Sequence, residues 1–231
     1  MHIYRSQPLV CTLSRGAAET NQDTLMVDSG LPSRFMTDDG TLSRLAAAAV
    51  KRQQYPQALR LLSQLVERHP EQALHYNNRG LVYLKLGQPQ PALADCDRAV
   101  ALAPDLDQAY NNRAMCHAAL GEMASALDDY ERAIDLNPFN SRARINLGAT
   151  LRQMGDLDLA LDCFDEALMF HQLPEFIYAE RGRTYHLRGD WNCAIADYRR
   201  ALAAAQTSNV QSLVERVKRW AAELVPQLSW A

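Results

Sequence analysis

The sequence has few residues that interrupt helices and lacks the patterns that build sheets. Its 231 residues include 10 glycines and 10 prolines, and these are spaced along the chain instead of clustered. Val, Ile and Thr form no alternating runs of the kind that strands require. Hydrophobic residues make up 48% of the chain, so it can bury a sizeable core. We therefore expect an all-α protein.

The charge is balanced, which excludes recognition driven by a strong field of one sign. The chain has 24 Lys and Arg against 27 Asp and Glu, a formal net charge of −3 at pH 7. It has no basic stripe with interleaved aromatic residues, so we expect no nucleic-acid partner. No stretch approaches the roughly 18 apolar residues that a membrane-crossing helix needs, so we also expect no membrane span.

Cysteines and histidines are few and scattered. The five cysteines are odd in number and form no C-x-x-C pair, which fits neither a disulfide framework nor a zinc site. A reducing, cytoplasmic compartment is the simpler interpretation. The six histidines show no metal-ligand spacing, and no glycine-rich phosphate loop is present. We therefore expect no metal, no cofactor and no enzyme activity.

What the sequence does have is repetition. Shifting it by 34 residues aligns like residues from Asp39 to Ser208, and a fixed period of this length marks stacked supersecondary units. The alignment defines five units: 39–72, 73–106, 107–140, 141–174 and 175–208. An alanine recurs in every unit, at Ala58, Ala92, Ala126, Ala160 and Ala194. Another position is always small, at Ala46, Gly80, Ala114, Gly148 and Gly182. We expect two helices to approach closely at these positions.

A turn residue divides each unit into two segments of similar length. It is Gln53 in the first unit and glycine in the others, at Gly87, Gly121, Gly155 and Gly189. The second segment carries apolar residues at helical spacing after the recurrent alanine. Pro70, Pro104 and Pro138 then end it, because proline cannot continue the helical hydrogen-bond ladder. Each unit is therefore predicted to be a pair of helices.

The second unit carries the residues that identify the repeat. These are Tyr76-Asn77-Asn78-Arg79-Gly80, Tyr83, Gly87, Ala92, Ala99 and Pro104. In this pattern the unit resembles a tetratricopeptide repeat, and the spacing is kept through all five units. The resemblance implies a right-handed α-solenoid of stacked antiparallel helix hairpins. It also implies that the first helix of each hairpin lines a concave surface that binds other proteins.

The remaining segments and the weaker units have their own expectations. Residues 1–38 show no repeat and are expected to form a flexible or loosely docked tail. Residues 209–231 are expected to hold a C-terminal capping helix, with a docking helix for another protein as the alternative. The fourth unit has its proline two residues late, so an irregular or longer junction is expected from His171 to Pro174.

Two positions switch together between apolar and charged. Three units carry arginine before the small residue and aspartate sixteen residues later: Arg79 and Asp95, Arg113 and Asp129, Arg181 and Asp197. The first and fourth units carry Leu45 with Leu61 and Leu147 with Cys163 at the same two positions. Charge inside a helical hairpin is tolerated only when it is paired. We therefore predict a salt bridge between the two helices of each of those three units.

The expected concave surface contains a ladder of asparagines. Its candidate peptide-binding residues are Asn77, Asn78, Asn111, Asn112 and Asn146. Asparagine is a mediocre helix former, and its amide offers a donor and an acceptor that match a peptide backbone. Further candidates flank the ladder: Leu81 and Met115 for apolar contact, and Arg142, Arg152 and Arg183 for acidic or C-terminal carboxylate groups. The alternative is that the asparagines only join neighbouring hairpins.

The leading hypothesis is therefore a protein-interaction scaffold, an adaptor or assembly factor, that binds an extended or helical segment of a partner. An alternative is a self-assembling structural protein, a homo-oligomer whose tail or C-terminal helix docks in a neighbouring copy. A carboxylate clamp for chaperone C-termini is disfavoured, because the pattern of lysine, asparagine and arginine that it requires is mostly absent. An enzyme or its regulatory half is disfavoured for want of converging catalytic groups.

Overall fold

The computed structural model describes residues 38–208 and 210–224. These residues form eleven α-helices and no strand. The helices are α1 (Asp39–Lys51), α2 (Tyr55–Arg68), α3 (Ala73–Lys85), α4 (Pro89–Leu102), α5 (Asp107–Leu120), α6 (Met123–Leu136), α7 (Ser141–Met154), α8 (Leu157–Leu168), α9 (Pro174–Arg188), α10 (Trp191–Ser208) and α11 (Gln211–Leu224). The expected tail 1–38 lies almost wholly outside the described residues, as do the last seven residues of the chain.

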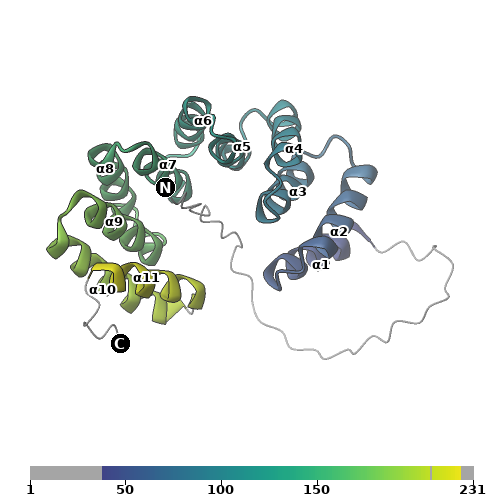
Figure 1. Cartoon of the computed structure of the whole chain (residues 1–231). Helices are drawn as coiled ribbons and strands as arrows, with labels where there is room; N and C mark the ends of the chain where they lie inside the picture. Colours follow the sequence, from purple (N-terminus) through teal and green to yellow (C-terminus); the bar gives the residue numbers. More distant parts are fainter. Residues whose placement is uncertain (1–37, 209, 225–231) are drawn as a thin grey trace, which may run out of the picture.

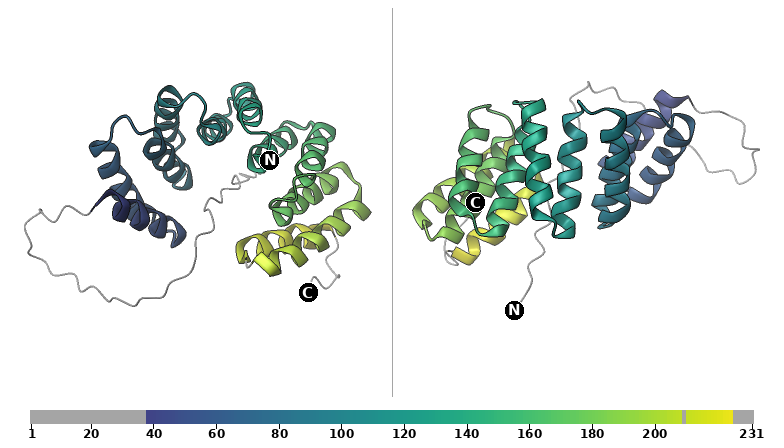
Figure 2. Two further views of the ribbon diagram at one scale, coloured as in Figure 1. Left: turned by 180° about the vertical axis from the view of Figure 1, so that it is seen from behind. Right: turned by 90° about the horizontal axis from the view of Figure 1, so that it is seen from above.

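The helices pack as consecutive hairpins along an arc. Each odd-numbered helix from α1 to α9 packs against the even-numbered helix that follows it. Figure 1 shows α4, α6 and α8 on the outer rim, with α3, α7 and α9 turned toward the inside of the arc. Figure 2 shows the same helices standing side by side when seen from above. The predicted all-α superhelix of stacked hairpins is confirmed.

The recurrent small residues lie where the two helices of a hairpin touch. The five recurrent alanines of the second helices are completely buried. A Cβ atom added to Gly148 would lie 2.8 Å from the ring of Phe164, and one added to Gly182 would lie 2.9 Å from the ring of Tyr198. Such distances are too short for a carbon contact, so a side chain here would separate the helices. The period of 34 is therefore a packing requirement.

The turns between the two helices of a hairpin require a left-handed backbone. Gly121 and Gly155 have φ of 85° and 99°, which glycine adopts without a Cβ clash. Gln53 occupies the same place in the first hairpin with φ 59°. The predicted irregular junction is confirmed, because α8 ends early, at Leu168, and the linker to α9 contains two more non-glycine residues with φ 52°, His171 and Leu173.

Helix α11 closes the C-terminal end of the arc. It packs against α9 and α10 in the way that a further first helix would. Leu213, Val217 and Ala221 are its buried residues, and Trp220 packs against the same core. A helix with these contacts is what the predicted capping role requires, and that role stays a prediction. None of the described helices is both long and apolar enough to cross a membrane.

Candidate functional site: the inner face of the arc

The three predicted salt bridges are confirmed, and each is bidentate. In each pair Nε and Nη2 of the arginine donate to the two carboxylate oxygens of the aspartate. The distances are 2.7 and 2.7 Å for Arg79 and Asp95, 2.7 and 2.7 Å for Arg113 and Asp129, and 2.7 and 3.0 Å for Arg181 and Asp197. The aspartates are 6%, 6% and 1% exposed, respectively. The hydrogen bonds that Arg79 donates to Asp95 raise the pKa of Arg79.

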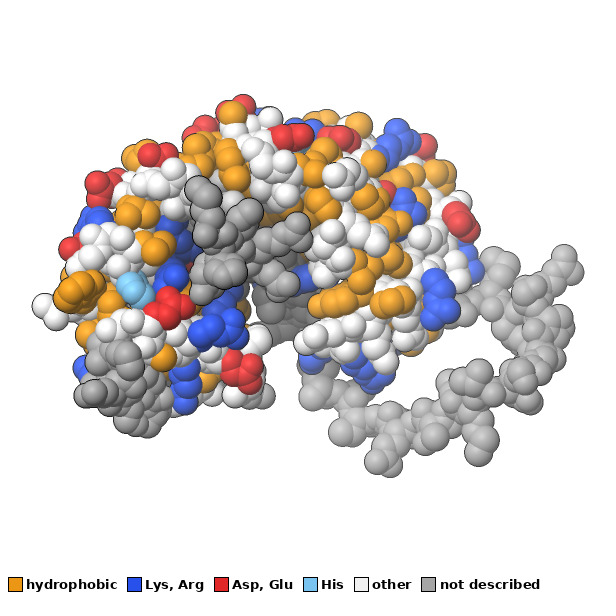
Figure 3. All heavy atoms as spheres, in the orientation of Figure 1, with side chains coloured by type: hydrophobic (Ala, Val, Ile, Leu, Met, Phe, Trp, Pro, Cys, Tyr) orange, Lys and Arg blue, Asp and Glu red, His pale blue; other side chains and the backbone are white. Residues whose placement is uncertain are grey.

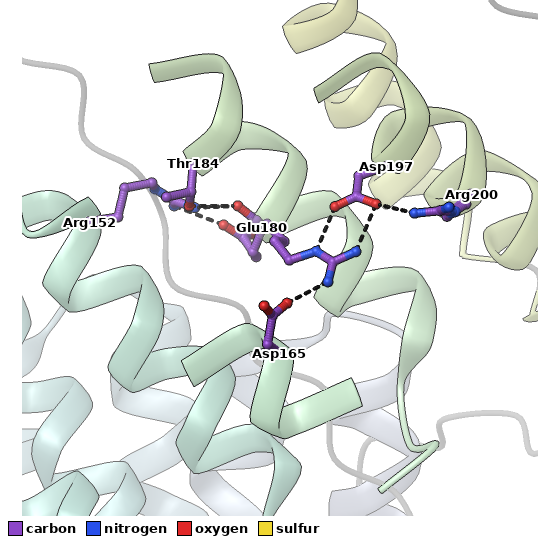
Figure 4. A network of polar contacts seen from close by, with 7 residues as sticks. Arg152, Asp165, Glu180, Thr184, Asp197 and Arg200 are labelled. Carbon is purple, nitrogen blue, oxygen red and sulfur yellow. Dashed lines mark hydrogen bonds and ion pairs between the residues drawn. The ribbon is translucent and has the colours of Figure 1, made fainter. Parts of the chain in front are cut away.

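The same arginines also link neighbouring hairpins, which the sequence analysis did not foresee. In each case Nη1 donates to the second helix of the preceding hairpin. The acceptors are Ser63 at 3.3 Å from Arg79, Asp97 at 3.3 Å from Arg113, and Asp165 at 2.5 Å from Arg181. Figure 4 shows Asp165 and Asp197 on either side of the guanidinium group in the last of these. These arginines therefore serve the stacking of the fold.

The asparagine ladder joins successive first helices through hydrogen bonds between side chains. Asn112 Nδ2 donates to Asn77 Oδ1 at 2.8 Å, and Asn146 Nδ2 donates to Asn111 Oδ1 at 3.0 Å. Asn111 Nδ2 also approaches Asn112 Oδ1 at 3.2 Å. Each bond between hairpins spans 35 residues, one more than the repeat. A position on one first helix therefore faces the following repeat position on the next first helix. The ladder is thus a contact between hairpins.

The prediction that these asparagines face solvent is wrong for all but one of them. Asn77, Asn111, Asn112 and Asn146 are 2%, 7%, 6% and 5% exposed. Their amides are used by one another, since the first helices approach closely enough for direct contact. The structure thus supports the alternative that these side chains join hairpins. Asn78 differs, because it is half-buried.

The two apolar candidates are also covered. Met115 is 1% exposed, and its sulfur lies 3.9 Å from Asn111 Nδ2. Leu81 is 6% exposed and lines a cavity between the first hairpin and α3. Leu81 therefore lines a cavity, whereas Met115 is part of the core.

Arg152 and Arg183 form ion pairs with glutamates of the chain. Arg183 Nη1 lies 2.6 Å from Glu223 Oε2 on α11. Arg152 Nη2 lies 2.8 Å from Glu180 Oε2, and its Nη1 donates to the Glu180 carbonyl at 3.0 Å. Figure 4 shows Arg152 and Glu180 facing each other from α7 and α9. The expectation that these two arginines are available to a partner is therefore wrong. Arg142 is half-buried.

Glu180 is the residue that the sequence analysis missed. It occupies the position in the fifth hairpin that Asn146 occupies in the fourth. The residue 35 positions before it is Ile145, so an asparagine here would face a side chain without an amide. It is 3% exposed and lies between Arg152 and Arg216, with 3.2 Å from its Oε1 to Arg216 Nη2. Burial lowers the pKa of Arg216, and Nε and Nη2 of Arg216 make no hydrogen bond to the described residues. The sequence did contain a signal for this residue, because Glu180 stands at a repeat position where the preceding hairpin carries Asn146.

Charge is divided between the inner and outer layers of the arc. Helices α3 and α7, on the inner side, carry basic residues and no acidic residue within their described spans. Helix α8, on the outer rim, carries Asp158, Asp162, Asp165 and Glu166 and no basic residue. Figure 3 shows acidic side chains along the outer edge of the arc. In these hairpins the inner layer is therefore the more basic one.

Groups suited to catalysis or metal binding are not gathered in the described part of the chain. No cluster of three His, Cys, Asp or Glu side chains that could hold a metal ion occurs among residues 38–208 and 210–224. The cysteines of these ranges, Cys96, Cys116, Cys163 and Cys193, are free thiols. What the inner face offers is a shape with hydrogen-bonding and charged groups.

Comparison with known proteins gives the chain its relatives. Two proteins of Drosophila melanogaster, Hsc70-interacting proteins 1 and 2, are each 38% identical over 61 residues, which is 26% of this chain and 16% of theirs. The structure resembles TTC0263, a thermophilic TPR protein of Thermus thermophilus, with a TM-score of 0.72 at 23% identity over 79% of this chain and 98% of that one. It resembles MamA with a TM-score of 0.56 at 20% identity over 74% and 93%.

The structural likenesses establish the fold, and family models establish the membership. Models described as tetratricopeptide repeat match residues 43–107, 108–140 and 129–162. Together these matches span more than half of the chain, from within α1 to the middle of α8. On this evidence, the chain belongs to the tetratricopeptide repeat family.

Proposed function

We propose that the chain is an adaptor or assembly factor whose inner face binds an extended, acidic segment of a partner protein. Tetratricopeptide repeat proteins are protein-interaction scaffolds, and this chain has the fold of one. The observation that carries the proposal is the division of charge. The inner helix α7 has Arg142, Arg144 and Arg152 and no acidic residue, whereas α8 behind it has four acidic residues and no basic one. Arg144 lies 3.6 Å from Glu166 of α8 and Arg152 pairs with Glu180, so only part of this basic charge faces a partner.

The surface for this partner is narrower than the sequence suggested. The buried asparagines and Met115 are covered, and glutamates already neutralise Arg152 and Arg183. The proposed contacts are Asn78 and Leu81, which share the wall of one cavity, and Arg142, which lies half-buried in the first turn of the basic helix α7. Carboxylates of a partner would meet the basic inner layer, while an apolar side chain would enter the cavity.

The relatives support a protein partner but do not identify the partner of this chain. Two of them are named for interacting with Hsc70, but the match covers a small part of each. A cytoplasmic location is part of the proposal, and the free thiols are consistent with it. The alternative of self-assembly through the C-terminal helix loses support, since α11 packs against its own α9 and α10.

A charge-reversal pull-down tests the proposal. Arg142→Glu on the inner face should remove partner proteins captured from a lysate of the source organism. Arg132→Glu on the outer helix α6 changes the net charge equally and is the matched control, because Arg132 is exposed there. If the contact is electrostatic, raising the salt concentration should release the captured partners from the unaltered chain. Equal capture by both variants would contradict the proposed surface.

A further inference from the structure

The first two hairpins meet differently from the others. From α3 onward, successive first helices contact each other directly, and among the described helices α1 and α3 do not do so to the same extent. A cavity of about 100 Å³ lies between α1, α2 and α3. Its apolar walls include Ala46, Ala47, Val50, Leu62, Leu81 and Val82. A benzene-sized molecule fits an apolar cavity of about 150 Å³, so this one has room for one aliphatic side chain.

The asparagine ladder stops at this cavity. The spacing that joins Asn112 to Asn77 leads from Asn78 to Ser43, whose side chain is short. Within the described residues the side-chain amide of Asn78 makes no hydrogen bond. Ser43 and Asn78 both line the cavity, beside its apolar walls. The cavity therefore combines an apolar interior with a donor and an acceptor suited to a peptide backbone.

Basic residues stand next to the lining residues. Arg44, which donates to Thr41 at 3.0 Å, follows Ser43, and Lys51 follows Val50, whereas none of the lining residues is acidic. Helix α3 has no acidic residue. The carboxylate of Asp39 on α1 is already paired with Arg68 and His69, at 2.9 and 2.6 Å. An occupant with an aliphatic side chain and flanking carboxylates would complement these surroundings.

The chain itself contains such a segment shortly before α1. Residues 19–28 hold three acidic residues and no basic one, around the aliphatic run Leu25-Met26-Val27. Nine residues separate Asp28 from Asp38, and they can span up to about 30 Å. Helix α1 rises only about 17 Å from its first residue to Val50. The segment is therefore long enough to return to the cavity of its own chain.

We propose that residues 19–28 dock in this cavity, with an aliphatic side chain of the run between α1 and α3 and the backbone at Asn78. A short tether gives the segment an effective concentration of about millimolar, so a weak contact suffices to hold it. The docked segment covers one end of the inner face, and a partner that uses this end must displace it. The contact is within one molecule and does not depend on which partner the rest of the face binds.

Disulfide trapping in the full-length chain tests the docking. Cysteines replace Thr24, beside the aliphatic run, and Ser43, on the cavity wall, with Cys11 and Cys193 changed to serine. The reference pair is Thr24→Cys with Leu45→Cys, because Leu45 is exposed on α1 and does not line the cavity. The tether is nearly the same, so an undocked tail should link both pairs equally. We expect the Ser43 pair to form an intramolecular disulfide about tenfold faster.

Two variant sets identify the occupant. Leu25→Asp with Met26→Asp changes only the segment and should abolish the preference for Ser43. Ala47→Glu places a carboxylate on the cavity wall and should do the same, whereas Ala48→Glu, the neighbouring alanine outside the lining, should not. Equal rates for the two cysteine pairs, or a preference that survives both the Leu25/Met26 and Ala47 changes, would overturn the proposal. Disulfide-linked dimers in place of intramolecular links would overturn docking within one molecule.

Discussion

Arg113 donates two hydrogen bonds of 2.7 Å to the two carboxylate oxygens of Asp129, across the helices of the third hairpin. The guanidinium group also lies 5.3 Å from the ring centre of Tyr110, one turn earlier on α5. Asp129 is 6% exposed, so its charge depends on this arginine for compensation. The pair thus explains why the two positions change together in the sequence.

Asp129→Ala should lower the free energy of unfolding by about 3 kcal/mol, since it leaves Arg113 partly buried without its main partner. Denaturant unfolding measures this loss. Asp128→Ala is the matched control, because Asp128 is the exposed neighbour on the same helix, and it should change stability by less than about 0.5 kcal/mol. Equal losses for the two variants would show that the pair contributes no more than a surface charge does.

The sequence predicted the hairpins and these ion pairs because each depends on residues that recur at a fixed spacing. Gly148 and Phe164, or Arg113 and Asp129, must be compatible in every copy, so the period reports their contact. The ladder was misjudged for a related reason. Recurrence alone cannot distinguish a side chain that faces a ligand from one that faces the next hairpin, and the distance between first helices decides which. Glu180 escaped because it occurs in one unit only.

Asn112→Ala should destabilise the fold, whereas Asn78→Ala should leave it almost unchanged. Asn112 donates to Asn77 at 2.8 Å and both are buried, so the substitution leaves a buried carbonyl without its partner and costs about 1 to 3 kcal/mol. Asn78 makes no hydrogen bond through its side chain to the described residues. Thermal unfolding of both variants measures the difference. A larger loss for Asn78→Ala would place the structural ladder at the wrong positions.

Glu180→Gln and Arg216→Met should have very different effects on stability. Glu180 has two arginine neighbours, Arg152 at 2.8 Å and Arg216 at 3.2 Å. Removing its charge leaves two like charges close together in a buried site, which should cost about 3 kcal/mol or more. Removing Arg216 leaves one balanced pair, so the change should be within about 1 kcal/mol of zero. Chemical denaturation separates these outcomes, and equal losses would contradict the shared role of Glu180.

His186 should titrate below its usual pKa of 6.5. Burial lowers its pKa, and the charge of Arg183 lowers it further. The folded chain then binds this proton less readily than the unfolded chain does. The contribution to stability is thus present above pH 6.5 and is lost as the pH falls from 6.5 to the folded pKa. Proton NMR of the ring follows the titration. Arg183→Met should raise the midpoint, whereas Arg188→Met should not, and a midpoint at or above 6.5 in the unaltered chain would contradict the assignment.

Gln53 holds the left-handed backbone of the first turn without being glycine. Its φ is 59°, whereas the same place in the other four hairpins is taken by glycine. A left-handed conformation costs a residue with a Cβ about 1 to 2 kcal/mol, which glycine would relieve. Part of this stabilisation is lost again, because glycine has more conformational entropy in the unfolded chain. Gln53→Gly should therefore stabilise the chain by about 1 kcal/mol.

The neighbouring residue provides the control for this substitution. Arg52 has φ −86°, so Arg52→Gly relieves no strain and should destabilise the chain by a few tenths of a kcal/mol or more. The reverse change, Gly121→Gln, should destabilise the third hairpin by about the amount that Gln53→Gly gains, because Gly121 has φ 85°. Thermal melts of the three variants test the sign of each effect. Stabilisation by both Gln53→Gly and Arg52→Gly would show that the gain comes from loop flexibility and not from the left-handed backbone at Gln53.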